Sequence, residues 1–144
     1  MLNIEAVNHV GIRVSDKDKS IAFYEAMGFQ TRSDTGFYEG HPVIMKHPCG
    51  VVINLLGPAN TGSDSNILMD VDEKHAGITH VALTVESLAQ AKEFVESAGI
   101  PITGSFSFGP MSAIFIRDPD RNVIELDAYS LKDQDGDGYE SHPQ

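Results

Sequence analysis

The chain has 144 residues, 41% of them hydrophobic, which suits one domain with a substantial hydrophobic core. It carries 10 basic and 21 acidic side chains, a formal net charge of −11, which argues against a nucleic-acid-binding protein, because such proteins gather Lys and Arg on one face. No run approaches the roughly 18 apolar residues of a membrane helix. The N-terminus lacks the features of a secretion signal and the single cysteine, Cys49, cannot form an internal disulfide. We therefore expect a cytoplasmic protein that binds no membrane.

The first predicted element is a half-buried strand at residues 9–14, where apolar and more polar residues alternate in the segment HVGIRV. A helix is expected over Ser15–Met27 because apolar residues there follow a helical spacing. Gly28 stands where a left-handed residue commonly ends a helix. Three further strands are expected at residues 30–38, 42–46 and 51–56.

The second half of the chain repeats this order at a constant offset of 71 residues. Eleven residues are identical to their counterparts 71 positions earlier without a gap, where chance at average composition would give about three. A capping box at Ser87 and Gln90 predicts the start of the second helix, and Gly99 predicts its end. The second copy is expected to contain strands at residues 80–85, 101–108, 113–117 and 123–129.

The repeat predicts an α+β fold made of two tandem βαβββ modules within one domain, 1–144. Module 1 is expected at about residues 5–57, a polar linker at 58–76 and module 2 at about 77–129. The acidic tail, residues 130–144, lacks apolar periodicity, which predicts disorder. Its aspartates imitate the start of an EF-hand loop, but Gln144 stands where the calcium-binding Glu should be, which argues against a calcium site.

Strand alternation predicts which side chains share a face. If the apolar residues of the first strand pack beneath the helix, His9 and Arg13 project from the opposite face of the sheet. The same alternation in the last strand of each copy assigns Asn54 and Glu125 to that face. With His80, the counterpart of His9, four equivalent positions of the repeat are expected to point into one concavity.

Two imidazoles and one carboxylate form a ligand set suited to a divalent transition metal. A single histidine at the start of a strand is more often an ordinary polar end residue than a ligand. Here a histidine stands at both equivalent positions and Glu125 at a third, which favours a metal site made of His9, His80 and Glu125. The candidate metals are Fe, Mn, Co, Ni and Zn, and Asn54 occupies the fourth position.

The repeated plan, the segments HVGIRVSD, SIAFYEAMGF, THVALTVES and AKEFVESAGI, and the run IFIRDPDRNVIEL resemble the vicinal oxygen chelate superfamily. This superfamily includes glyoxalase I, extradiol dioxygenases, fosfomycin-resistance enzymes and bleomycin-resistance proteins. The resemblance covers residues 5–129. It implies that the two modules form a cupped mixed sheet, with a metal in the concavity held from the first and last strand of each module. His9, His80 and Glu125 match the metal ligands.

Glyoxalase I carries Glu or Gln at the position of Asn54, and carboxylates at its metal-bound positions act as bases. Asn54 has no titratable group and so cannot be that base, but its amide can face the metal or a metal-bound water. The resemblance therefore implies catalytic positions at Glu125 and Asn54. Arg13 resembles an arginine that holds a glutathione carboxylate, which implies binding of an anionic substrate; the alternative is a solvated charge at the end of a strand.

Extradiol dioxygenases share the two-histidine, one-glutamate set, but a tyrosine and a nearby histidine of their signature are absent. Phe115 stands in place of the tyrosine and is expected to contact substrate. The predicted function is a divalent-metal-dependent enzyme of lyase or isomerase type that acts on a small, anionic substrate and forms a homodimer. The alternatives are an Fe(II)-dependent dioxygenase with the same ligands, and a non-catalytic drug- or metabolite-binding protein of the bleomycin-resistance type.

Overall fold

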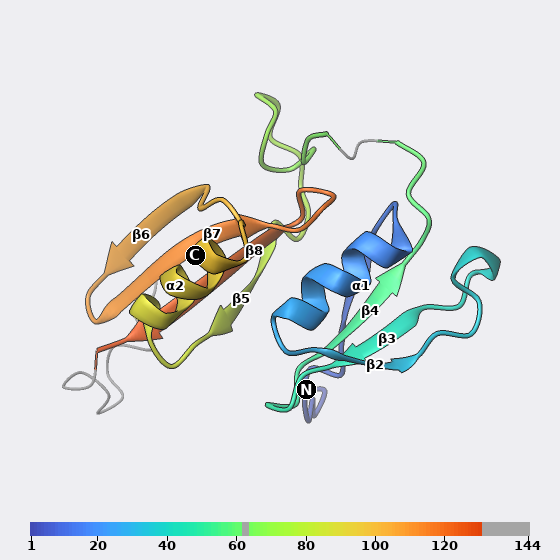
Figure 1. Cartoon of the computed structure of the whole chain (residues 1–144), viewed down its shortest axis with the longest axis horizontal. Helices are drawn as coiled ribbons and strands as arrows, with labels where there is room; N and C mark the ends of the chain where they lie inside the picture. Colours follow the sequence, from blue (N-terminus) through green and yellow to red (C-terminus); the bar gives the residue numbers. More distant parts are fainter. Residues whose placement is uncertain (62–63, 131–144) are drawn as a thin grey trace. The chain divides into compact units, whose positions relative to one another are not determined.

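The computed structural model describes residues 1–61 and 64–130. The chain divides into two compact units, each built from one copy of the repeat (Figure 1). The first unit runs from Met1 to Asn66 and also contains Pro119–Arg121. The second runs from Ile67 to Asp118 and resumes at Asn122. The acidic tail and its EF-hand-like residues lie, apart from Ser130, outside the described residues.

The first unit is a four-stranded mixed sheet with one helix against one face (Figure 1). The strand order is β1-β4-β3-β2, in which β1 runs parallel to β4 and the other neighbours are antiparallel. Its elements are β1 (Val10–Arg13), α1 (Lys17–Ala26), β2 (Gln30–Ser33), the 3-10 helix η1 (Phe37–Glu39), β3 (Val43–Lys46) and β4 (Val52–Leu56).

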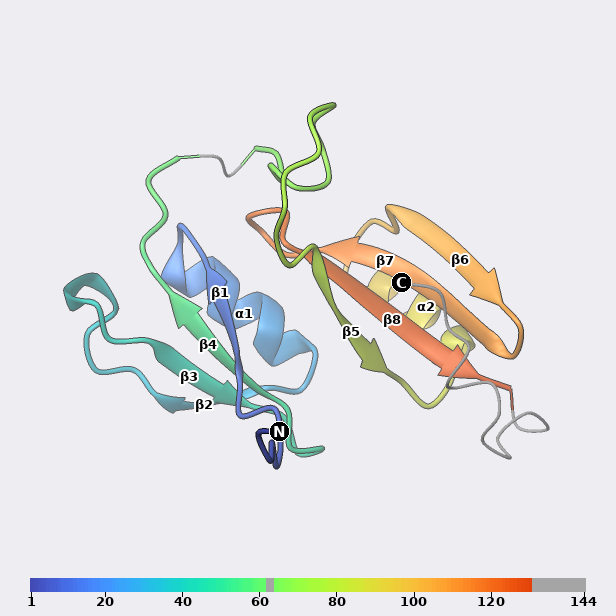
Figure 2. The same ribbon diagram turned by 180° about the vertical axis from the view of Figure 1, so that it is seen from behind.

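The second unit repeats this topology in the order β5-β8-β7-β6, and Figure 2 shows these strands in front of α2. Its elements are β5 (His80–Thr84), α2 (Leu88–Ser97), β6 (Gly104–Phe108), β7 (Met111–Arg117) and β8 (Val123–Tyr129). The parallel pair also keeps the register of the first unit, because Val10 aligns with Ile53 and Val81 with Ile124. The prediction of an α+β fold with tandem βαβββ modules is confirmed.

Both helices begin and end as the sequence predicts, within one or two residues. The side chain of Asp16 accepts a hydrogen bond from the backbone N–H of Lys19 at 3.1 Å, which caps α1. Ser87 caps α2 in the same way through Gln90, at 3.3 Å. The glycines that follow the helices, Gly28 and Gly99, have φ angles of 102° and 71° and so adopt the left-handed conformation.

Two predicted strands are shorter than expected. The strand predicted at residues 30–38 ends at Ser33, and the chain then turns into η1, where the Phe37 ring is buried against the backbone of Gly57. A Cβ atom at Gly57 would overlap that ring, so the missing side chain makes this packing possible. The strand predicted at 101–108 begins at Gly104.

The core of each unit consists of apolar residues that alternate along the strands. The buried strand residues of the first unit are Ile12, Val43, Met45, Ile53 and Leu55; those with the same alternation in the second are Ile114, Ile116, Ile124 and Leu126. The helices complete these cores with Tyr24 of α1 and with Ala91 and Val95 of α2. No helix in the described part of the chain is long and apolar enough to cross a membrane.

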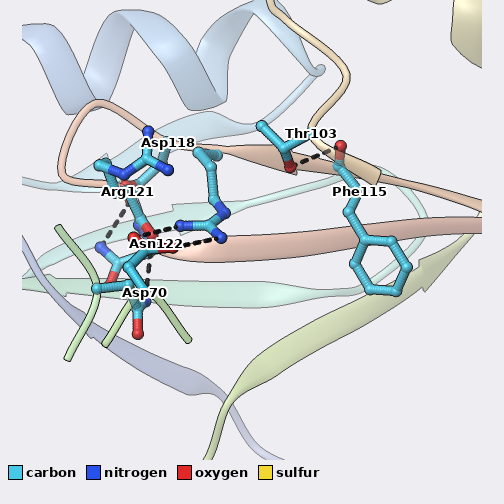
Figure 3. Close-up of polar contacts among 8 residues, drawn as sticks. Asp70, Thr103, Phe115, Asp118, Arg121 and Asn122 are labelled. Atoms are coloured by element: carbon cyan, nitrogen blue, oxygen red, sulfur yellow. Dashed lines mark hydrogen bonds and ion pairs between the residues drawn. The ribbon is translucent and has the colours of Figure 1, made fainter. Parts of the chain in front are cut away.

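The turn between β7 and β8 is held by its own side chains, and its tip, Pro119–Arg121, belongs to the first unit. The carboxylate of Asp118 accepts hydrogen bonds from the backbone and side-chain nitrogens of Asn122, each at 2.9 Å (Figure 3). At the tip, Asp120 accepts hydrogen bonds from the backbone N–H of Ser15, at 2.9 Å, and from its hydroxyl. The carbonyl oxygen of Arg121 accepts one from Asn66 at 3.1 Å.

The segment that precedes β5 is also fixed by a charged contact within the second unit. Arg117, the last residue of β7, donates two hydrogen bonds to the carboxylate of Asp70, at 2.9 and 3.0 Å. Such paired contacts between a guanidinium and a carboxylate hold a defined geometry. Part of the predicted linker is therefore packed against the second sheet.

Candidate functional site

His80 and Glu125 lie together on the sheet face of the second unit that α2 does not cover. His80 is the first residue of β5, and Glu125 is paired with Ala82 in the middle of β8. The imidazole Nε2 of His80 lies 3.1 Å from Oε1 of Glu125. Their side chains are 32% and 12% exposed, so the pair is accessible from one side. Two of the three predicted metal ligands thus meet within one unit.

Both predicted histidine ligands are held through the same ring nitrogen. Nδ1 of His80 lies 2.8 Å from Oγ1 of Thr79, and Nδ1 of His9 lies 2.7 Å from Oδ1 of Asn8. The two partners are themselves equivalent in the repeat, 71 residues apart. A metal-binding histidine commonly donates one ring N–H to a neighbouring oxygen, which fixes the ring and presents the other nitrogen. Nε2 is therefore the nitrogen that each ring can offer to a metal.

The first unit carries the other two predicted positions. His9 is exposed and directly precedes β1, while Asn54 lies in β4, aligned with Gly11. Oδ1 of Asn54 is buried, and no donor among the described residues reaches it. Residues 1–61 and 64–130 contain no group of three or more His, Cys, Asp or Glu side chains that could hold a metal ion. Ligation by His9 together with His80 and Glu125 therefore stays a prediction.

A second carboxylate, which the sequence reasoning assigned no role, lies beside Glu125. Asp127 is only 6% exposed and accepts a hydrogen bond from Oγ1 of Thr84 at 2.7 Å. Burial raises the pKa of Glu125, the negative charge of Asp127 raises it further, and His80 acts in the opposite direction. The sequence signal that could have identified Asp127 is its place two positions after Glu125, on the same face of a largely buried strand.

The two predicted substrate contacts lie in different units. Arg13 is exposed at the end of β1 and aligns with Leu56. Phe115 lies in β7 directly opposite Glu125, and its ring centroid is 5.9 Å from that of His80. Figure 3 shows the carbonyl oxygen of Phe115 accepting a hydrogen bond from the hydroxyl of Thr103, with the ring pointing away from that contact. Phe115 therefore lies beside the predicted ligands of the second unit.

These observations fit a divalent metal ion. A half-buried carboxylate with a second carboxylate beside it favours a positive charge. In the second unit the His80 ring, whose Nδ1 contacts Thr79, offers Nε2 as a nitrogen donor beside the carboxylate of Glu125. In the first unit, taken by itself, His9 offers Nε2 in the same way, and Asn54 has a buried amide oxygen that no donor among the described residues reaches. Nitrogen and oxygen donors of this kind suit Fe, Mn, Co, Ni or Zn.

Two known proteins are similar to this chain in sequence. The lactoylglutathione lyase of Schizosaccharomyces pombe is 29% identical over 133 residues, which cover 83% of this chain and 43% of that protein. This chain thus spans less than half the length of that relative. The glyoxalase domain-containing protein RDO1 of Mycosarcoma maydis is 25% identical over 133 residues, covering 89% of this chain and 70% of that protein.

The solved structure of a glyoxalase/dioxygenase from Nostoc punctiforme superposes with a TM-score of 0.70. Its sequence is 18% identical, and the match covers 89% of this chain and 93% of that one, which shows a shared fold. The sequence pattern of a whole superfamily also matches residues 6–126 of this chain. The chain belongs to the Glyoxalase/Bleomycin resistance protein/Dioxygenase superfamily.

Proposed function

We propose that this protein is a divalent-metal-dependent, glyoxalase-like enzyme of lyase or isomerase type. Its substrate is a small anion with two neighbouring oxygen atoms. The observation that carries the proposal is the matched anchoring of His9 and His80, whose Nδ1 atoms contact the preceding residue at equivalent positions of the repeat. The proximity of His80 and Glu125 adds the carboxylate of the set. The relative named lactoylglutathione lyase supports chemistry of the lyase type.

In this proposal the metal is held by Nε2 of His9, Nε2 of His80 and the carboxylate of Glu125. When bound, the ion supplies Lewis-acid stabilisation of negative charge on a substrate oxygen. Fe, Mn, Co, Ni and Zn all accept this mixture of imidazole and carboxylate ligands. Asn54 offers its amide oxygen at the fourth position and, having no titratable group, takes no proton.

The remaining roles follow from the chemistry of the side chains. Oε1 of Glu125 is the atom that accepts a proton from a carbon next to a substrate carbonyl, because Asn54 cannot do so. The guanidinium of Arg13 binds a carboxylate or phosphate of the substrate through two parallel hydrogen bonds. Phe115, beside His80, limits the access of water to the reacting atoms.

The decisive experiment is metal analysis of the full chain purified without chelator, followed by anaerobic reconstitution with each candidate metal. We expect close to one metal ion per chain in the wild type and far less in the His80→Ala variant. Full occupancy in His80→Ala would contradict the proposal. Isomerisation or lyase turnover without oxygen consumption supports the proposed class.

The two alternatives give different results in the same preparation. Oxygen uptake that requires Fe(II) would indicate a dioxygenase with the same ligands. Tight binding of an anion without turnover would indicate a binding protein of the bleomycin-resistance type. Because Asn54 has no titratable group, we expect the wild type to form lactoylglutathione poorly, and efficient formation would show that this assignment of Asn54 is wrong.

A further inference from the structure

Residues 68–77, which precede β5 in the second unit, form a loop that closes on itself and contains no helix or strand. The side chain of Leu68, at its start, lies against the backbone of Gly77, at its end. A Cβ atom at Gly77 would be 2.9 Å from Cδ1 of Leu68, so the missing side chain allows this contact. A loop of about 6–16 residues whose ends meet is an Ω-loop, and such a loop packs as a unit. We call residues 68–77 the strap.

One charged side chain of the strap, Asp70, fixes it to the second sheet. Its carboxylate accepts two hydrogen bonds from Arg117, at 2.9 and 3.0 Å. The side chains of Asp70 and Arg117 are 19% and 15% exposed, so water reaches both. The paired geometry strengthens such a contact, but water and salt weaken it. The contact can therefore hold the strap closed and still break while the sheet stays folded.

Arg117 lies at the same end of the second sheet as His80. The register aligns Arg117 with Val123, and Val123 with His80. Because paired residues of neighbouring strands project from the same face, these three side chains share the face of Glu125, two residues after Val123. Val123 is 6% exposed, so its side chain is covered on that face. The strap is thus fixed on the face of the predicted ligands, at the row that contains His80.

The far part of the strap is open to solvent. Residues 72–77 are all exposed, and Ile78, which follows them, is 88% exposed. Segments with few buried side chains open at a lower free energy than the core strands of a domain. Thr79, the next residue, contacts Nδ1 of His80 at 2.8 Å. Since Ile78 and Thr79 alone separate the strap from His80 in the sequence, a change in the position of the strap reaches the backbone of that histidine.

We propose that the strap is a gate that controls access to the metal ligands His80 and Glu125. It is closed while Asp70 pairs with Arg117, and it opens as a unit when that pair breaks. Opening changes the rates of metal binding and release by the same factor, because the strap adds no ligand, and so it leaves the metal affinity unchanged. The effect on the metal rests on the proposed function, whereas the opening of the strap does not.

The first test measures the opening by trypsin cleavage after Lys74, the exposed lysine of the strap. It compares the full-length wild type with Asp70→Asn, which keeps the size of the side chain and removes its charge. We expect cleavage after Lys74, identified by the masses of the fragments, to be about three- to tenfold faster in Asp70→Asn. Added NaCl should speed cleavage of the wild type, relative to a short peptide substrate, and change that of Asp70→Asn little. Equal rates in the two proteins would overturn the gate.

Asp34→Asn is the matched control, because it breaks the ion pair of Asp34 with Lys17 in the first unit, whose side chains are 33% and 26% exposed. Its rate of cleavage after Lys74 should equal that of the wild type. Leu68→Ala weakens the closure of the strap without changing a charge. It should also speed cleavage and keep the salt dependence, since Asp70 and Arg117 are intact.

The second test follows the release of Zn(II) from the loaded full chain to an excess of a chromophoric chelator. We expect release to be about three- to tenfold faster in Asp70→Asn than in the wild type, with the same Kd for Zn(II) in equilibrium competition. Faster cleavage without faster release would overturn the gate and leave the proposed function standing. A wild type that takes up no Zn(II) would overturn the proposed function and, with it, the gate.

Discussion

The two units have the same strand order, yet they place one shared residue in opposite environments. Phe37 is 2% exposed in the first unit, and its counterpart Phe108 is 41% exposed in the second. The residue that receives the Phe37 ring is Gly57, whose counterpart is Ala128. Phe37 belongs to the 3-10 helix η1, whereas Phe108 is the last residue of strand β6. The two phenylalanines therefore differ in local backbone structure as well as in burial.

The open faces of the two sheets differ as well. The first sheet has an exposed Arg13 and the amide of Asn54 there, with His9 directly before β1, whereas the second has His80, the carboxylates of Glu125 and Asp127, and the side chains of Phe106, Phe108 and Phe115. The strand order of the repeat has been kept, while the segment after β2 and many side chains that face away from the helices have changed.

The largest expected effect is on stability and concerns the two equivalent phenylalanines. Phe37→Ala should lower the free energy of unfolding by about 3–5 kcal/mol, the cost of removing a buried aromatic ring. Phe108→Ala should change it by less than about 0.5 kcal/mol, since this residue is half-exposed at a sheet edge. Urea denaturation of both variants measures the difference. Similar losses in the two variants would show that Phe108 has a packing role after all.

The second prediction contrasts equivalent positions in the last strands, Glu125 and Asn54. Glu125→Ala should weaken metal binding about a hundredfold or more, since it removes the only charged ligand of the proposed set. Asn54→Ala should retain the metal because an amide is a weak ligand. Equilibrium dialysis against a metal-sensitive dye gives both affinities. Loss of metal from both variants to the same degree would contradict the division between the units.

The third prediction concerns Asp127, whose counterpart in the first unit is Leu56. Asp127→Asn keeps an oxygen that accepts the hydrogen bond of Thr84 and removes a negative charge beside Glu125. Affinity for a divalent metal should fall about ten- to a hundredfold, as for other groups that support a ligand. The metal-free protein should be at least as stable as the wild type, because a like-charge repulsion is lost.

Asp34→Asn is the matched control for that experiment, since Asp34 pairs with Lys17 at an exposed position of the first unit. Its metal affinity should equal that of the wild type. A lower melting temperature of metal-free Asp127→Asn, with unchanged metal affinity, would indicate that Asp127 serves the fold alone.

The smallest predicted effect concerns a feature that both units have, the contact between Nδ1 of a histidine and the residue before it. Thr79→Val and Asn8→Leu each remove the oxygen beside Nδ1 of a histidine, so each should weaken metal binding about tenfold. Thr79→Ser restores the hydroxyl and should restore most of the affinity. If only one of the two substitutions lowered the metal affinity, only the histidine next to that residue would need its Nδ1 contact for metal binding.

Much of the fold could be predicted from the sequence because its signals are local. The caps at Asp16 and Ser87 and the glycines at the helix ends act within a few residues. The prediction that the strand extends from residue 30 to 38 was wrong, because the strand's end depends on a distant contact, the packing of Phe37 on Gly57. A pattern read within ten residues does not contain that contact.

The candidate site was likewise predictable only where its signals are local in the sequence. Strand alternation and the repeat placed His80 and Glu125 on one face, and their side chains lie 3.1 Å apart. The role of Asp127 was missed because burial, rather than residue type, distinguishes it from a solvated acidic residue. The direction of the phenylalanines in β6 was missed because it depends on the register with β7, which the short segment GSFSF does not specify.

The hydrogen bonds from Ser15 to Asp120 have a consequence for the order in which the protein folds during synthesis. The first unit leaves the ribosome first, but one of its contacts is made by residues 119–121, which are translated about a hundred residues later. Synthesis proceeds at about 5–20 residues per second, so this contact forms several seconds after Ser15 has been made. The first copy therefore completes its own fold only when most of the second copy has been translated.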